Sequence, residues 1–376
     1  MIKILNLLLI IFSIHCRLNS EPPSVSFTFL IADLKHSEEE GIKICELQSG
    51  VFSAFRGYDW LVNEPGAVPK KVISMLQQFG QFVWVSPGVV QELAILNEMK
   101  NHEINFAPKI QELYQEKSFL TEAALPVEDP YDLASYPVLL IANRNYFKGK
   151  LESFNHDFPN VVVFDQALFP YFRDKNKMSQ LFSGDPLLER IRPRWRLCER
   201  KMTIDEINQT PGYFSSEYVV IKPLHALLGR GIIFVERNKL PEILEFICHK
   251  PKKLSNHKDK GYQYWSNAKD TELIIEEFHY SDPVAVPHLG NKEYDPTLRI
   301  AFMVWHEHGE IHMDFIEEHW KLPYKALSEK GTFKDKHKSY EHIPYFELVE
   351  PERKAAIQQQ LRETIPLIYA KMLGWE

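Results

Sequence analysis

The chain has 376 residues, a formal net charge of -7, and 44% hydrophobic residues. This length and apolar content exclude a disordered protein and supply the core of two or three domains. The negative charge and the pI of about 6.1 argue against a general nucleic-acid or anionic-membrane surface, because such surfaces accumulate lysine and arginine.

The N-terminal residues 1–20 contain one early lysine, Lys3, which is followed by a mostly apolar run from Ile4 to Ile14. A lysine followed by about a dozen apolar residues is typical of a secretory signal and is too short for a full membrane span. This segment therefore predicts export, with cleavage after Ser20 and no integral membrane span in the mature chain. The alternatives are a buried N-terminal strand or an uncleaved leader, which would leave the protein in the cytoplasm.

The remaining cysteines give a conflicting indication. With Cys16 set aside, Cys45, Cys198 and Cys248 are an odd number without close spacing, so they do not form a disulfide framework. They favour a reducing compartment, whereas the N-terminus favours export.

Residues 21–172 alternate predicted strands and helices. Apolar or alternating runs predict strands at residues 24–32, 42–47, 82–85, 137–142 and 161–165. Helical spacing of apolar residues predicts helices at residues 68–79, 89–99, 110–120 and 148–158. Strands that alternate with helices in this way predict a parallel sheet, so we expect this region to be an α/β domain.

The following region, residues 173–376, contains a candidate phosphate-binding hairpin. Tyr218 to Ile221 and Ile232 to Val235 predict two strands, and Lys222 stands at the end of the first. The Gly229-Arg230-Gly231 loop precedes the second strand, and glycines there let backbone amides cradle phosphate oxygens. An ordinary hairpin with a solvated lysine has the same spacing. The motif is not a Walker loop, because its lysine precedes the glycines.

Two further strands and a helix follow this hairpin. An apolar strand, Glu272 to Phe278, ends in carboxylates. Asp295 to Met303 predicts the next strand, which precedes a turn at His308 to Glu310. Pro351 to Leu373 predicts an amphipathic helix close to the end of the sequence.

Three histidines near this turn have a spacing that could bind zinc. They are His306, His308 and His312. Two of them lie beside Gly309 in a hairpin turn and no cysteine is near, so the sequence disfavours a metal site here.

The order of these features resembles the ATP-grasp superfamily, the carboxylate-amine ligases that include glutathione synthetase, tubulin tyrosine ligase and the glutamate-adding ligases. The resemblance covers residues 174–323. It implies an α/β fold in which a parallel-sheet domain, residues 21–172, precedes ATP-grasp lobes, residues 173–376. It also implies ATP and Mg²⁺ as cofactors.

The resemblance implies which residues bind the ATP phosphates. Lys222 would contact phosphate, and the loop of Gly229, Arg230 and Gly231 would close over it. A second cation would come from the start of a helix, where Lys175 and Lys177 are both candidates and Lys177 is favoured.

The resemblance also implies residues for the base and the reacting group. Glu276, Glu277 and Phe278 would line the adenine. Arg299 would steady the acyl phosphate. Lys321, at the end of a later strand, is a further candidate for substrate binding.

The metal ligands are the feature that the resemblance leaves unassigned. Family members hold magnesium with an aspartate on one strand and a Glu-x-Asn on the next, both after a helix like Pro351 to Leu373. This sequence ends at that helix and has no asparagine after Asn291. Three explanations stay open: a truncated chain, a degenerate nucleotide binder, or a takeover of the metal by Asp314 with Glu317 or Glu318. Asp314 and Glu318 would face the same side of an extended strand.

The sequence thus predicts ATP-dependent ligation of a small-molecule or peptide carboxylate to an amine through an acyl phosphate. The alternative is an inactive relative that binds a nucleotide or a protein partner. A third hypothesis is an exported binding protein in which the grasp-like order is coincidental.

Overall fold

The computed structural model has a mixed α/β fold, as the sequence predicts. It describes residues 25–49, 55–76, 78–79, 81–85, 105–107, 129, 131–133, 138–142, 161–171, 174–226 and 229–375. The signal-like segment 1–20 and the predicted helices at 89–99, 110–120 and 148–158 lie outside these residues. Within the described ranges, no helix combines the length and the apolar character that crossing a membrane requires.

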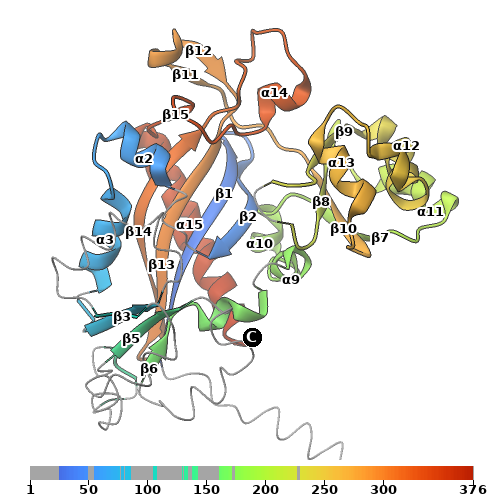
Figure 1. The fold of residues 1–376 in the computed structure, drawn as a ribbon. Coiled ribbons are helices and arrows are strands. Elements are labelled where there is room, and N and C mark those ends of the chain that lie inside the picture. Colours follow the sequence, from blue (N-terminus) through green and yellow to red (C-terminus); the bar gives the residue numbers. More distant parts are fainter. Residues whose placement is uncertain are drawn as a thin grey trace, which may run out of the picture.

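One antiparallel sheet, the large sheet, takes strands from both halves of the chain. Its order is β15–β14–β13–β1–β2, with β1 at Ser26–Ser37, β2 at Gly41–Ser49, β13 at Thr297–Glu307, β14 at Glu310–Lys321 and β15 at Phe346–Glu347. Figure 1 shows the blue β1–β2 hairpin beside the orange strands β13 and β14. The N-terminal hairpin therefore completes a sheet of C-terminal strands, and the predicted boundary between residues 172 and 173 does not separate two sheets.

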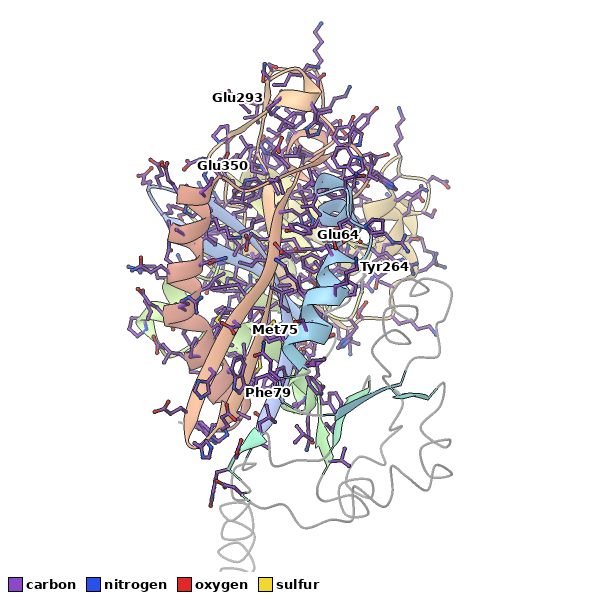
Figure 2. The ribbon with its side chains drawn as sticks, turned by 90° about the vertical axis from the view of Figure 1, so that its left-hand side faces the viewer. Glu64, Met75, Phe79, Tyr264, Glu293 and Glu350 are labelled. Carbon is purple, nitrogen blue, oxygen red and sulfur yellow. The ribbon has the colours of Figure 1, made fainter. Side chains whose placement is uncertain are left out.

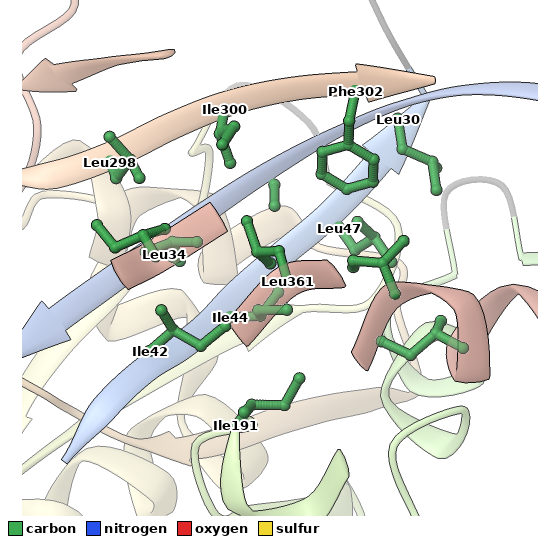
Figure 3. Close-up of a cluster of buried hydrophobic side chains, with 14 of the residues drawn as sticks. Leu30, Leu34, Ile42, Ile44, Leu47, Ile191, Leu298, Ile300, Phe302 and Leu361 are labelled. Carbon is green, nitrogen blue, oxygen red and sulfur yellow. The ribbon is translucent and has the colours of Figure 1, made fainter. Parts of the chain in front are cut away.

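Strand β1 is buried on both faces because the large sheet is covered on both sides. On one face Leu30 packs with Leu361 of α15 (Pro351–Met372) in the cluster drawn in Figure 3. On the other face Phe27 packs into a cluster with α3 (Ala67–Leu76). Figure 2 shows these two helices on opposite sides of the strands. Burial on both faces explains why this stretch of sequence is mostly apolar.

A smaller antiparallel sheet, within residues 195–277, forms a second body that we call the small lobe. Its order is β7–β10–β8–β9, with β7 at Trp195–Glu199, β8 at Tyr218–Pro223, β9 at Ile233–Glu236 and β10 at Glu272–Glu277. Its core takes side chains from α11 (Ile204–Gln209), α12 (Leu240–His249) and α13 (Lys260–Asn267). The strands predicted around Lys222 and at residues 272–278 are confirmed.

Four short strands pair in parallel, in the order β4–β3–β5–β6. They are β3 at Gln81–Val85, β4 at Asn105–Ala107, β5 at Val138–Ala142 and β6 at Val161–Val163. Asp165 joins the end of β6 to β1: its backbone N–H donates to Phe27 O at 2.9 Å, and its Oδ1 accepts from Phe29 N at 2.9 Å.

The remaining described elements connect these sheets. They are α2 (Arg56–Leu61), α9 (Lys175–Gln180), α10 (Pro186–Arg190), α14 (Phe333–His337) and the hairpin of β11 (Val284–Val286) with β12 (Lys292–Tyr294). Asp174 caps α9 by accepting from the Asn176 and Lys177 amides, and Thr332 with Asp335 forms a capping box at α14. Both helices begin where the sequence provides a capping side chain.

Asp165 offers a test of how β6 is held against β1. Burial raises the pKa of its carboxyl to about 7, so the stability it contributes is present below the unfolded pKa and is lost as pH rises towards 7. Asp165→Asn keeps an acceptor for the Phe29 amide and suits the left-handed backbone at this position, where φ is 59°. We expect the variant to melt above wild type at pH 8, with a difference that shrinks as pH is lowered to 4. A difference independent of pH in thermal unfolding would contradict this.

Candidate functional site

A cavity of about 970 Å³ lies between the large sheet and the small lobe. Its walls come from β1, β2, β13 and β14 of the large sheet, from β8 and β10 of the small lobe, and from residues 324–342, which follow β14. Lysines, arginines and carboxylates reach it from both sides, so the cavity is a charged site enclosed by two bodies.

A row of polar side chains crosses the cavity face of the large sheet. Cross-strand pairing places Glu46 of β2 opposite Asp33, Asp33 opposite Arg299, and Arg299 opposite His319. Side chains directly opposed in this way lie about 5 Å apart at Cβ. His319 is fully buried, and burial, together with the charges of Arg299 and Lys321, lowers its pKa well below the ordinary value. This histidine is therefore neutral.

Asp33 is the centre of a buried charge network. Its carboxylate accepts from Arg299 Nε at 2.9 Å and Nη2 at 2.8 Å, and from Lys321 Nζ at 2.8 Å. Burial alone would raise the pKa of Asp33, but the charges and hydrogen bonds of Arg299 and Lys321 lower it well below its usual value. The carboxylate is therefore ionised throughout the physiological pH range.

A second buried network connects the small lobe to β2. Glu276 is paired with Lys222 and, at 2.8 Å, with Arg192 Nη2. Lys222 Nζ donates to Cys45 O at 3.2 Å, and Arg192 Nη1 donates to Ile44 O at 2.9 Å. Burial would raise the pKa of Glu276, but Lys222 and Arg192 lower it. These contacts meet at a β-bulge, where the register of β1 and β2 shifts between Asp33 and Leu34.

The two candidate lysines at the start of α9 differ in whether they reach the cavity. Lys175 lines the cavity, and its Nζ donates to Ala226 O at 2.6 Å. Burial lowers its pKa. Lys177 is exposed and does not line the cavity. The favoured candidate, Lys177, is thus not brought to the site, because the helix turns it towards solvent while Lys175 faces inward.

The glycine loop reaches the cavity through only one of its three residues. Gly229 lines the wall, and Arg230 is exposed and lies outside the lining. Gly231 has a φ of 73°, and a Cβ there would lie 2.5 Å from Tyr264 Cδ1 and 2.6 Å from Pro223 Cγ. Gly231 is therefore required for packing of the hairpin, whereas Gly229 is placed to meet a ligand.

The carboxyl end of β10 forms another wall. Glu276, Glu277 and Phe278 all line the cavity. Glu277 Oε1 accepts from the Ser215 backbone N–H at 2.5 Å and from Ser215 Oγ at 2.8 Å. Phe278 N donates to Tyr218 O at 3.0 Å. Glu276 and Glu277 already have protein partners, so Phe278 offers the surface that a ligand could contact.

The structure also brings in residues that sequence reasoning missed. Asp33 on β1 and the Glu46-Leu47-Gln48 segment on β2 place Asp33, Glu46 and Gln48 on the cavity wall. An aspartate on one strand and Glu-x-Gln on the next match the Asp and Glu-x-Asn order in residue type, except that Gln replaces Asn. These residues stand in the N-terminal hairpin, whereas the resemblance implies metal ligands after Arg299.

Asp314, Glu317 and Glu318 of β14, one of the three explanations left open for the metal, are not brought to the cavity. A register shift between Ala301 and Phe302 interrupts the alternation of β14, so Asp314 shares a face with Glu317 and not with Glu318. Glu317 pairs with Lys71, and Glu318 pairs with Lys354 and accepts from Gln358 Nε2. None of the three carboxylates lines the cavity.

The histidines near the β13–β14 turn do not form a metal site either. His306 contacts Trp375, with ring centroids 4.1 Å apart, and His312 stacks on Trp305. His308 lies in the turn with a φ of 50°. Across the described parts of the chain, no three or more His, Cys, Asp or Glu side chains are grouped to hold a metal ion.

Comparisons with known proteins find similarity at the level of structure only. No protein-family model matches the chain, and no curated protein matches it in sequence.

Three solved structures are similar over most of their length. A protein from Methylobacillus flagellatus KT named as a gamma-glutamylcysteine synthetase has 11% identity and a TM-score of 0.43, covering 93% of this chain and 89% of that one. A glutathione synthetase-like effector from Globodera pallida has 13% identity and a TM-score of 0.39, covering 80% and 74%. D-alanyl-alanine synthetase A from Vibrio cholerae has 11% identity and a TM-score of 0.34, covering 78% and 80%. At these TM-scores the similarities carry no functional assignment.

The Arg192–Glu276 pair provides a test of the connection between the small lobe and β2. Arg192→Met leaves Glu276 buried with one cation fewer and removes the hydrogen bonds to β2, so we expect a loss of about 3 kcal/mol in the free energy of unfolding. Lys239→Met breaks an exposed pair with Glu236 and should change stability little. Urea unfolding measures both variants, and equal stabilities would contradict a structural role for Arg192.

Proposed function

We propose that the protein is an ATP-dependent ligase that joins a carboxylate to an amine through an acyl phosphate. The observation that supports this most directly is the arrangement of charge around one cavity. Lys175 of α9 and Lys222 of β8 line one side of the cavity, and Asp33 and Glu46 of the large sheet also line it. Lysines bind phosphate oxygens, and carboxylates bind the divalent cation that accompanies a nucleoside triphosphate.

The base of ATP would lie at the small-lobe end of the cavity. Val220, Phe234 and Phe278 line this part, and the rings of Phe234 and Phe278 meet edge to face with centroids 5.8 Å apart. Aromatic and branched side chains of this kind bind a flat ring by burial and stacking. Glu277, bonded to Ser215, would shape this wall rather than contact the base.

The phosphates would extend from the base towards Lys222 and Lys175. Gly229 borders the same stretch of wall, with a φ of 65°. Lys222 is buried and Lys175 is partly buried, and partners hold both in place: Glu276 pairs with Lys222, and the Ala226 carbonyl accepts from Lys175. Cations held in place in this manner bind phosphate without further ordering of their side chains.

Asp33, Glu46 and Gln48 are the residues that would hold Mg²⁺. Asp33 and Glu46 are directly opposed on neighbouring strands, and Gln48 lies on the same face two residues on. Mg²⁺ takes oxygen ligands and is commonly held by one or two carboxylates together with substrate phosphates, so this donor set fits. The lowered pKa of Asp33 keeps it in the ionised form that binds a cation. Mg²⁺ would supply neutralisation of the charge on the phosphates.

Arg299 and Lys321 would act on the group that is transferred. A carboxylate oxygen of the substrate attacks the γ-phosphorus, the bond to the β-phosphate oxygen breaks, and ADP leaves with that electron pair. The amine nitrogen then attacks the acyl carbon, the bond to the phosphate oxygen breaks, and the amine loses a proton. Arg299 and Lys321 lie beside Asp33, where their charges stabilise the oxygens that gain negative charge.

The alternative is a protein that binds nucleotide without chemistry. One observation favours it: both carboxylate oxygens of Asp33 accept hydrogen bonds from Arg299 and Lys321, so a metal would have to compete with these cations. The role of magnesium distinguishes the two functions.

Magnesium dependence gives the first test of the ligase site. We expect ATP to raise the melting temperature, magnesium to increase that rise, and Glu46→Gln to abolish only the increase due to magnesium. Glu310→Gln, at the exposed β13–β14 turn, is the matched control and should behave as wild type. A shift that ignores magnesium supports the alternative function, and no shift with ATP in either condition rejects the nucleotide site.

Lys175→Met and Lys177→Met form a matched pair on α9. Only Lys175 reaches the cavity, so we expect about tenfold weaker binding of ATP with magnesium for Lys175→Met, or ~1.4 kcal/mol. Lys177→Met should bind as wild type does. Isothermal titration calorimetry measures both affinities, and equal losses for the two variants would place the phosphates elsewhere.

A further inference from the structure

The segment at residues 324–342, which we call the strap, crosses from the large sheet to the small lobe. It leaves the end of β14, contains α14, and leads to β15. Figure 1 shows α14 at the end of the large sheet, next to β9. Several of its residues line the cavity, so the strap forms a wall that neither sheet provides.

The strap is fastened to the small lobe at three points. The ring of Phe333 stacks on Tyr218, with centroids 3.7 Å apart and planes 14° from parallel. Lys334 Nζ lies 2.5 Å from Asp259 Oδ1. Lys338 Nζ donates to Gly229 O at 3.5 Å, at the one glycine of the loop that meets the cavity. The strap thus closes over the proposed phosphate region.

Glu341 of the strap reaches into the charge network of the large sheet. Its Oε1 lies 3.1 Å from Arg299 Nη2 and 3.0 Å from Lys321 Nζ. The side chain of Glu341 is 51% exposed, whereas those of Arg299 and Lys321 are 8% and 4% exposed. A carboxylate from the surface therefore occupies the accessible side of two buried cations.

Charge balance explains why this position is filled. Arg299 and Lys321 carry two positive charges, Asp33 contacts both with one negative charge, and Glu46, opposite Asp33, adds a negative charge that acts on Arg299 without contacting it. Buried cations are stabilised most by anions in direct contact, so a second anion beside the pair is favourable. Glu341 supplies that anion from the chain itself. A carboxylate or phosphoryl group of a substrate would require the same two cations.

We propose that Arg299 and Lys321 form the subsite for the oxyanion of the substrate, and that Glu341 occupies it as an internal competitor until the strap withdraws. This inference rests on the proposed function, which places the transferred group beside Arg299. The ligand class is a carboxylate or its acyl phosphate. The strap is then a self-inhibiting lid: its Glu341 leaves the cations when an external anion arrives.

Inorganic phosphate is the probe for this subsite, because it binds without any nucleotide. Calorimetry would compare wild type, Glu341→Gln and Glu329→Gln. Glu329 lies on the same strap but pairs with Lys292, 2.9 Å away, so its variant has the same change in charge without touching the subsite. We expect Glu341→Gln to bind phosphate about tenfold more tightly than wild type, and Glu329→Gln to match wild type.

Two outcomes of the calorimetry would overturn the proposal. Equal or weaker binding of phosphate by Glu341→Gln means that Glu341 does not compete for the subsite, and weaker binding specifically would mean that it helps to hold the ligand. Absence of phosphate binding in both wild type and Glu341→Gln would reject the subsite. A separate titration of wild type with magnesium and ADP tests the nucleotide site. Failure of the ligase proposal can therefore be distinguished from failure of the proposal for Glu341.

Hydrogen exchange of the strap adds a measurement that does not depend on affinity. We expect phosphate to speed exchange of the amides of residues 324–342 in wild type. In Glu341→Gln, exchange should be fast before phosphate is added. Unchanged exchange in wild type at saturating phosphate would show that the strap stays in place, against the proposal. The melting temperature of Glu341→Gln reports whether the variant is folded.

Discussion

The pairing of Asp33 with Arg299 and Lys321 is the interaction on which the rest of the structure depends. Asp33 and Arg299 are 266 positions apart in the sequence, yet their side chains are buried together. Buried ions are tolerated only when their partners are in place. The pair also fixes register, because a slip of one residue would turn Asp33 towards the apolar face that packs on α15. The charges therefore specify how β1 enters the sheet.

A second set of buried charges joins the small lobe to the large sheet. Arg192 and Lys222 donate to carbonyls of β2 at the bulge beside Asp33, and both pair with Glu276. The side chains that would hold phosphate are thereby fixed in position relative to the β1–β2 hairpin, which carries Glu46. Two bodies with separate cores share one set of fixed charges, which is the condition for binding a polyanion between them.

Sequence reasoning succeeded where the relevant order is local. Lys222, its strand and the strand ending at Phe278 could be predicted, because hydrophobic periodicity and glycine placement are visible within a few residues. The partner of β13 could not be, since periodicity gives no information about which distant strand pairs with it. This is why Glu46 was missed.

Two finer features of the structure could not be predicted for the same kind of reason. A single bulge in β14 put Asp314 and Glu318 on different faces, and a bulge leaves no clear mark in a pattern of alternating residues. The choice between Lys175 and Lys177 depended on the rotational phase of α9, which is set by its contacts and not by its composition. Strand pairing, bulges and helix phase are tertiary properties, and they determine which of these side chains face the cavity.

The shared sheet has a consequence for biosynthesis. A ribosome makes β1 and β2 long before β13, and at about 5–20 residues per second the intervening chain takes roughly 13–50 s to appear. During this time β1 can pair with β2, but its other edge lacks β13, and an exposed apolar strand edge of this kind favours aggregation. Contacts of such long range also slow folding. The cavity that β1, β2, β13 and β14 line can therefore form only after β13 and β14 have been translated.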